Sequence, residues 1–119
     1  KPSYGLTDGE IARMLQEGFA TAAQDMKARS LVEARVDADR MLIATQSALD
    51  ADGALLSAHE RAEVDALMAQ LRTTRADSHD AATVEAATEA LAKGTEAFAA
   101  ERMNHSIQKA LAGKNVETL

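Results

Sequence analysis

The feature that most constrains this chain is the long stretch from Thr7 to about Asp50, which has no proline and repeats its apolar residues at helical spacing. Thr7 and Glu10 have the Thr-x-x-Glu spacing of a capping box, in which each side chain accepts a hydrogen bond from a free N–H of the first turn. Leu6 and Ile11 hold the flanking positions of a hydrophobic staple. The stretch therefore predicts one long helix with a specified start.

The apolar row of this helix changes face about halfway along. The first row is Ile11, Leu15, Phe19, Ala22 and Met26; the second is Leu31, Ala38, Leu42, Thr45 and Leu49, with Arg35 in the missing slot. The step from Met26 to Leu31 is five residues, which breaks the helical spacing of one face. We expect a kink or a change of packing partner between Ala22 and Leu31.

A third row keeps the same alternation of four and three residues on a neighbouring face and comprises Val32, Val36, Asp39, Ile43 and Gln46. A helix with two half-apolar rows has two surfaces to cover. One row is expected to pack on the rest of this chain, which leaves the other for a partner outside it. The alternative is a single wide apolar face of the ordinary kind.

Shorter helices are predicted after the long one. Gly53 suits a left-handed residue at a helix end. Ser57 and Glu60 form a second capping box, and the helix that they open should end near Arg75. Asp80 can cap a third helix.

Two glycines in the last part of the chain predict helix boundaries. Gly94 interrupts the helical pattern at a cost of roughly 1 kcal/mol relative to alanine, so a bend or a helix boundary is expected there. Gly113 is the predicted stop of the last helix. Beyond it the apolar content is too low to keep the chain packed.

These signals divide the chain into four parts. Residues 1–6 are expected to be a linker from a preceding domain, which the family resemblance given below implies is a β-sandwich, and residues 7–50 the long helix, kinked or not. Residues 51–113 complete a helical bundle, and residues 114–119 form a flexible tail. Because the sequence begins with lysine rather than methionine, we expect a piece of a longer protein.

Composition predicts an all-α protein. Alanine, glutamate, leucine and other helix formers dominate, aromatic residues make up only 3%, and the single proline precedes every predicted helix. The expected architecture is a long N-terminal helix that leads into an antiparallel three- to four-helix bundle. The predicted core consists of Leu42, Leu49, Val64, Leu67, Leu71, Val84, Leu91 and Phe98.

Charge and residue content argue against several classes of function. The formal net charge of −6, with no basic block, disfavours nucleic acid as a partner. No cysteine is present, which removes disulfides and thiolate chemistry and suits a reducing compartment. No apolar run approaches the length of a membrane span, and no signal-peptide core is seen at the N-terminus.

Catalytic or metal-binding residues are hard to find. Glu101 and His105 lie four residues apart and could share a helix face, but helical metal sites need several such groups from different helices. His59 and His79 fit exposed positions at a cap and in a loop. No nucleophile elbow or phosphate-binding glycine loop occurs, so we expect no catalytic site, no metal site and no ATP hydrolysis by this chain.

Nearly the whole chain resembles a known family. Gly-Leu-Thr-Asp-Gly-Glu-Ile-Ala-Arg-Met at 5–14 and Leu-Val-Glu-Ala-Arg-Val-Asp-Ala-Asp at 31–39 resemble the start of the helical lid in seventy-kilodalton heat-shock chaperones, the DnaK family. Phe-Ala-Ala-Glu-Arg-Met-Asn-His-Ser-Ile-Gln-Lys-Ala-Leu-Ala-Gly at 98–113 is similar to the branch dedicated to iron–sulfur cluster assembly. The resemblance implies a lid that covers the peptide groove of a β-sandwich.

The resemblance also implies residue roles. Asp25 and Asp39 match acidic latch residues that pair with arginines of the sandwich, whereas Ile43 and Gln46 stand where DnaK has histidine and arginine, which implies a more apolar latch. The row with Val32 and Val36 would then face the sandwich.

The implied partners are the β-sandwich, a peptide of an iron–sulfur scaffold protein and a J-domain co-chaperone that acts on the parent protein. ATP and magnesium would belong to the parent, in the bacterial cytoplasm, and this chain itself would carry no cofactor. Without the sandwich, exposed Ile11, Leu15 and Phe19 would favour association of two copies.

Two other hypotheses remain open. The chain could be a free-standing helical adaptor, which a bundle burying the segment from Thr7 to Ala28 would favour. A carboxylate-bridged metal enzyme would require a bound metal.

Overall fold

The computed structural model describes the backbone of residues 5–118 and the side chains of residues 5–113. Four α-helices follow one another: α1 (Asp8–Asp52), α2 (Ala58–Asp77), α3 (Ala81–Gly94) and α4 (Glu96–Thr118), with a short 3-10 turn, η1 (Gly53–Leu55), after α1. No strand occurs among the described residues, so the prediction of an all-α protein is confirmed. Residues 1–4 of the predicted linker lie outside the described part.

Helix α1 begins at the predicted capping box. Thr7 Oγ1 accepts a hydrogen bond from the Glu10 backbone N–H, and Glu10 Oε2 accepts one from the Thr7 N–H, both at 3.1 Å. The helix then runs for 45 residues without a break. Of the two outcomes expected between Ala22 and Leu31, the change of packing partner is the one found, because packing on α2 and α3 begins only at about Ser30.

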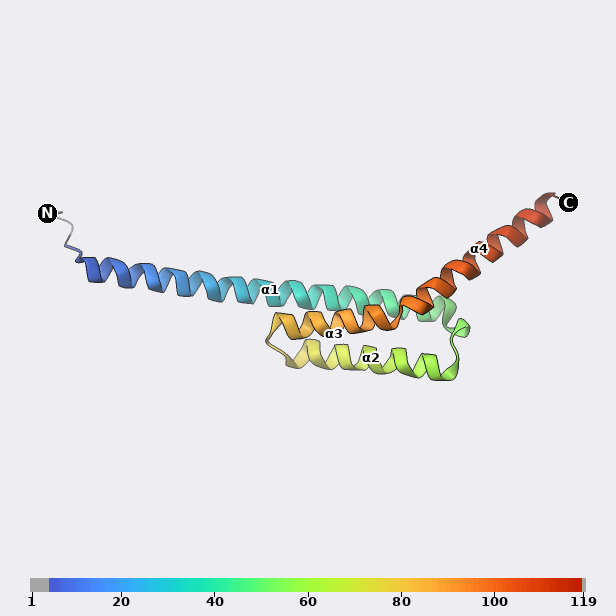
Figure 1. The fold of residues 1–119 in the computed structure, drawn as a ribbon, viewed down its shortest axis with the longest axis horizontal. Coiled ribbons are helices and arrows are strands. Elements are labelled where there is room, and N and C mark those ends of the chain that lie inside the picture. Colours follow the sequence, from blue (N-terminus) through green and yellow to red (C-terminus); the bar gives the residue numbers. More distant parts are fainter. Residues whose placement is uncertain (1–4, 119) are drawn as a thin grey trace.

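The C-terminal half of α1 lies beside α3, and α2 covers the other side of α3 (Figure 1). Together they form a three-helix bundle that lies between the two ends of a molecule 93 Å long (Figure 1). The N-terminal half of α1 extends from this bundle without a neighbour, and α4 leaves the bundle at an angle toward the other end (Figure 1).

The starts of the shorter helices agree with their predicted caps. Ser57 Oγ accepts from the Glu60 N–H at 3.1 Å, while Glu60 Oε1 accepts from the Ser57 N–H at 3.0 Å. Asp80 Oδ2 accepts from both the N–H and the hydroxyl of Thr83. These hydrogen bonds hold the pKa values of Glu60 and Asp80 below their usual range. Helix α2 ends at Asp77, slightly beyond the predicted Arg75.

Two glycine predictions are wrong. Gly53 has φ −57° and ψ −25°, so it is right-handed and continues the helix into η1 rather than ending it in a left-handed turn. Helix α4 passes through Gly113 and ends at Thr118. Glycine lowers helix propensity by about 1 kcal/mol but does not by itself force a left-handed conformation.

The core is close to the predicted one, with more small residues. The buried apolar residues are Ala34, Ala38, Ala48, Leu49, Val64, Met68, Leu71, Val84, Leu91 and Phe98. Six of the eight predicted core residues are among them, and Leu42 and Leu67 are half-buried against the same cluster. The alanines were missed as core residues because their short side chains give little signal in an alanine-rich sequence.

The predicted boundary at Gly94 is confirmed. Helix α3 ends there. Thr95 Oγ1 donates to the Leu91 and Ala92 carbonyls at 3.0 Å, and α4 starts in a new direction (Figure 1). Gly94 also packs closely on α2, because a Cβ at this position would overlap Leu67 Cδ1. Glycine at this position lets the end of α3 approach Leu67 of α2 without displacing its side chain.

We expect Gly94→Ala to destabilise the bundle although alanine favours helix. Forcing Leu67 out of its position should cost about 1–3 kcal/mol, which outweighs a gain of about 1 kcal/mol in propensity. Chemical denaturation followed by circular dichroism measures the change. Gly18→Ala, at a helical position with open space around it, is the control and should stabilise. Equal stabilisation by both changes would contradict the close contact.

Candidate functional site

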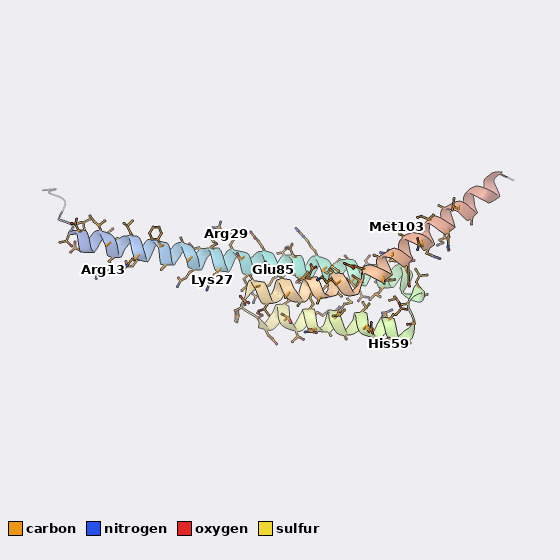
Figure 2. The ribbon with its side chains drawn as sticks, in the orientation of Figure 1. Arg13, Lys27, Arg29, His59, Glu85 and Met103 are labelled. Atoms are coloured by element: carbon orange, nitrogen blue, oxygen red, sulfur yellow. The ribbon has the colours of Figure 1, made fainter. Side chains whose placement is uncertain are left out.

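The most distinctive surface is the N-terminal half of α1, Asp8–Arg29, which we call the arm. Its apolar residues are exposed; Phe19 is 72% accessible, and Ile11 and Leu15 are about half accessible. Arg13 projects from it with no other helix alongside, whereas Lys27, near its C-terminal end, lies close to the loop that precedes α3 (Figure 2). Single exposed apolar residues are ordinary, but a row along one helix indicates an interaction surface.

The two rows predicted on the second half of α1 are confirmed as separate surfaces. The row with Ala38, Thr45 and Leu49 is buried against the bundle. The other row, here called the outer stripe (Val32, Val36, Asp39, Ile43 and Gln46), is mostly exposed, with Ile43 at 70%, and Asp39 is its one half-buried member. The single wide apolar face considered as an alternative is therefore not what forms.

The two predicted latch carboxylates have different surroundings. Asp25 is exposed on the arm and makes no ion pair or hydrogen bond with the described side chains. Asp39 instead forms a bidentate pair with Arg75 of α2, from Arg75 Nε to Asp39 Oδ1 at 2.8 Å and from Nη2 to Oδ2 at 2.9 Å. The hydrogen bonds that Arg75 donates to the Asp39 carboxylate raise the pKa of Arg75 above its usual value.

Sequence reasoning missed Arg75 as the partner of Asp39. Ser57 lies in the turn between the antiparallel helices α1 and α2. Asp39 is 18 residues before it and Arg75 is 18 residues after it. Because both helices rise by the same amount per residue, positions equidistant from the turn meet across the interface. This spacing was a usable signal for the pair.

A second link ties α1 to the loop between α2 and α3. Arg35, the polar residue in the buried row, donates from Nη2 to the Ser78 carbonyl at 2.9 Å. Its Nε is buried without a hydrogen-bond partner among the described residues. This link and the Asp39–Arg75 pair join α1 to the bundle near the point at which the arm leaves it.

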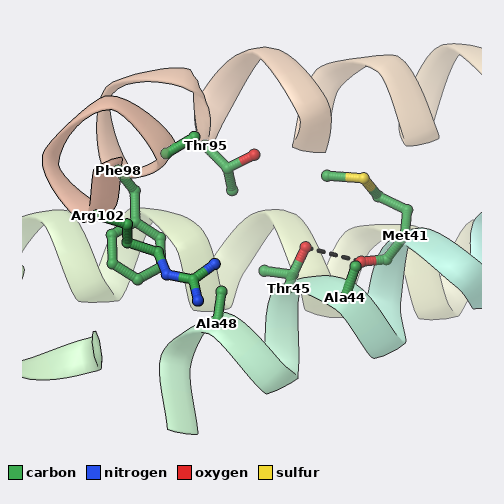
Figure 3. Close-up of a pocket in the computed structure, with 8 residues that line it drawn as sticks. Met41, Ala44, Thr45, Ala48, Thr95, Phe98 and Arg102 are labelled. Carbon is green, nitrogen blue, oxygen red and sulfur yellow. Dashed lines mark hydrogen bonds between the residues drawn. The ribbon is translucent and has the colours of Figure 1, made fainter. Parts of the chain in front are cut away.

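The base of α4 is anchored by a small polar and aromatic cluster. Arg102 Nε donates to Asp52 Oδ2 at 2.8 Å, and its guanidinium carbon lies 5.9 Å from the centre of the Phe98 ring. Beside it, Met41, Thr45 and Ala48 of α1 line an open groove of about 160 Å³ (Figure 3). The hydrogen bond from Arg102, aided by His105 and Lys109, lowers the pKa of Asp52.

The possible metal ligands Glu101 and His105 have no further ligand beside them among the described residues. Glu101 is exposed and His105 is half-buried, and the described residues contain no group of three His, Asp or Glu side chains placed to hold an ion. None of the described helices is long and apolar enough to cross a membrane.

Fold and surface define this chain as a helical subdomain with an extended, uncovered arm. Residues 1–104 match the family model for the Hsp70 protein. The whole chain is 72% identical to the Chaperone protein HscA homolog of Acidovorax sp. (strain JS42) and 71% identical to that of Delftia acidovorans (strain DSM 14801 / SPH-1). It is 57% identical to the homolog of Burkholderia multivorans (strain ATCC 17616 / 249).

The chain therefore belongs to the Hsp70 chaperones, the DnaK family. Within this family its relatives are HscA homologues, and the chain spans 19% of the length of each of those named. The resemblance inferred from the residues is confirmed.

The Asp52–Arg102 pair predicts a pH-dependent contribution to the anchoring of α4. Because the folded-state pKa of Asp52 lies below its ordinary value of 3.8, the pair stabilises above that value and is lost as pH falls through the folded pKa. We expect Asp52→Asn to lower the melting temperature at pH 7 and to have no effect near pH 2. A difference from the parent chain that persists unchanged at low pH would contradict this assignment.

Proposed function

We propose that this chain is the helical lid of the substrate-binding domain of an HscA-like chaperone. The arm and the outer stripe dock on the β-sandwich of the same protein and cover its peptide groove. The lid controls release of a peptide of an iron–sulfur scaffold protein. An absent nucleotide domain with ATP and magnesium drives the cycle in the bacterial cytoplasm, and a J-domain co-chaperone stimulates it.

The observation that carries this proposal is the uncovered arm. Ile11, Leu15 and Phe19 lie on the part of α1 that extends from the bundle. Their side chains are exposed and are not buried by any other described part of the chain. Each such side chain stabilises a contact by about 1.5–3 kcal/mol when fully buried. Covering the arm would thus supply enough free energy to hold a lid closed, and the continuous α1 would transmit its movement to the bundle.

The same observation disfavours the free-standing adaptor, which would bury the arm in its own bundle. The arm remains available for pairing between two isolated copies through Ile11, Leu15 and Phe19. We propose this pairing only for the chain without its sandwich.

The test of the lid role is peptide dissociation from the full-length parent protein with and without residues 7–119. We expect faster release of a scaffold-protein peptide from the truncated protein, because the groove loses its cover. An unrelated hydrophobic peptide is the control for selectivity. If the β-sandwich alone distinguishes the two peptides, the preference for the scaffold-protein peptide should persist without the lid. Unchanged release of both peptides would favour the adaptor.

The latch role of Asp39 needs a test that separates it from the pair with Arg75. In the full-length protein we expect Asp39→Ala to speed peptide dissociation by up to about fivefold, since a partly exposed ion pair contributes up to about 1 kcal/mol. Arg75→Gln breaks the same internal pair but leaves the carboxylate free for the sandwich.

Release should therefore be unchanged or slower in the Arg75→Gln protein. If both variants speed release equally, Asp39 acts only within the bundle and the latch assignment fails.

A further inference from the structure

A second uncovered apolar surface lies on α4, on the side that faces away from the bundle. Its residues Ala100, Met103, Ile107 and Ala110, here called the α4 seam, alternate by three and four residues, which is the spacing of a coiled-coil contact. Met103 is 66% and Ile107 51% exposed, and both lie beyond the point where α4 leaves the bundle. Figure 2 labels Met103 on this free part of the helix.

The orientation of the seam follows from the contacts at the base of α4. Phe98 is buried and Arg102 and His105 are half-buried on the side toward α1, where Arg102 bonds Asp52. The seam lies on the opposite side of the helix, because 100° per residue puts its mean position about half a turn from Phe98. The anchor that fixes α4 thereby turns the seam outward.

The order of residues along the seam is symmetric about His105. Ala100 and Ala110 lie five residues before and after it, and Met103 and Ile107 lie two before and after it. Two antiparallel copies whose two-fold axis is level with His105 would therefore form four layers. Methionine meets isoleucine in the two inner layers, and alanine meets alanine in the two outer layers, where small side chains allow close approach.

Charge selects the antiparallel arrangement. The next heptad position on the bundle side is Glu96, which is exposed, and antiparallel pairing keeps the Glu96 carboxylates of the two copies at opposite ends of the seam. A parallel pair would place Glu96 beside Glu96. The positions that flank the seam are all uncharged and comprise Ala97, Ala99, Asn104, Ser106, Leu111 and Gly113.

We propose that the α4 seam is an interface with a second copy of this chain, formed by antiparallel pairing of two α4 helices centred on His105. The interface is separate from the arm and does not depend on the lid role. In the parent protein it would join two chaperones through the ends of their bundles while both arms stay docked.

The natural absence of cysteine makes the register directly testable by disulfide cross-linking. We expect a mixture of Ala100→Cys and Ala110→Cys chains to form a covalent dimer under mild oxidation. Each variant alone should not, because identical residues would lie about 15 Å apart along the axis, which exceeds the reach of a disulfide. Cross-linking of each variant with itself, or none in the mixture, would overturn the proposal.

Matched charge substitutions separate this interface from the arm. Adding Ile107→Glu to both cysteine variants should abolish the cross-link, whereas adding Phe19→Glu on the arm should leave it intact. The opposite pattern would show that copies associate through the arm and would also overturn the α4 pairing.

Discussion

The structure depends on the close packing of α3 between α1 and α2. With few aromatic residues available, the core is built from three alanines and Leu49 on α1, from leucine, valine and methionine on α2 and α3, and from Phe98 on α4. Small side chains such as Ala34 and Ala38 let α3 approach α1, and Gly94 lets its end approach Leu67 of α2. The core thus combines close helix contacts at small residues with the fully buried side chains of Met68, Leu71, Val84 and Leu91.

The bundle in turn makes the arm possible. Starting a helix costs free energy, and an isolated helix is marginal in water even when its residues favour it. In α1 the second half is held by tertiary packing, so the arm only has to extend a helix that already exists. The capping box at Thr7 and Glu10 closes its far end. The arm can thus stay ordered while its apolar row remains uncovered.

Polar contacts at the two ends of the bundle set the directions in which the long helices leave it. At one end Arg35 and the Asp39–Arg75 pair join α1 to α2 and the following loop. At the other end Asp52 holds Arg102 at the base of α4. Both pairs are partly exposed, so they orient the helices more than they stabilise the fold.

The sequence by itself determined the helical class, the starts of three helices, the boundary at Gly94 and most of the core, because capping and periodicity are local properties of the chain. It also determined the family, because segments such as residues 5–14 and 98–113 match family motifs that are more specific than helical periodicity. It did not determine what Gly53 and Gly113 do, since glycine permits a left-handed turn without requiring one. Only the tertiary structure decided that Asp39 pairs with Arg75 and that α4 turns its apolar seam outward, because both follow from how separate helices meet in space.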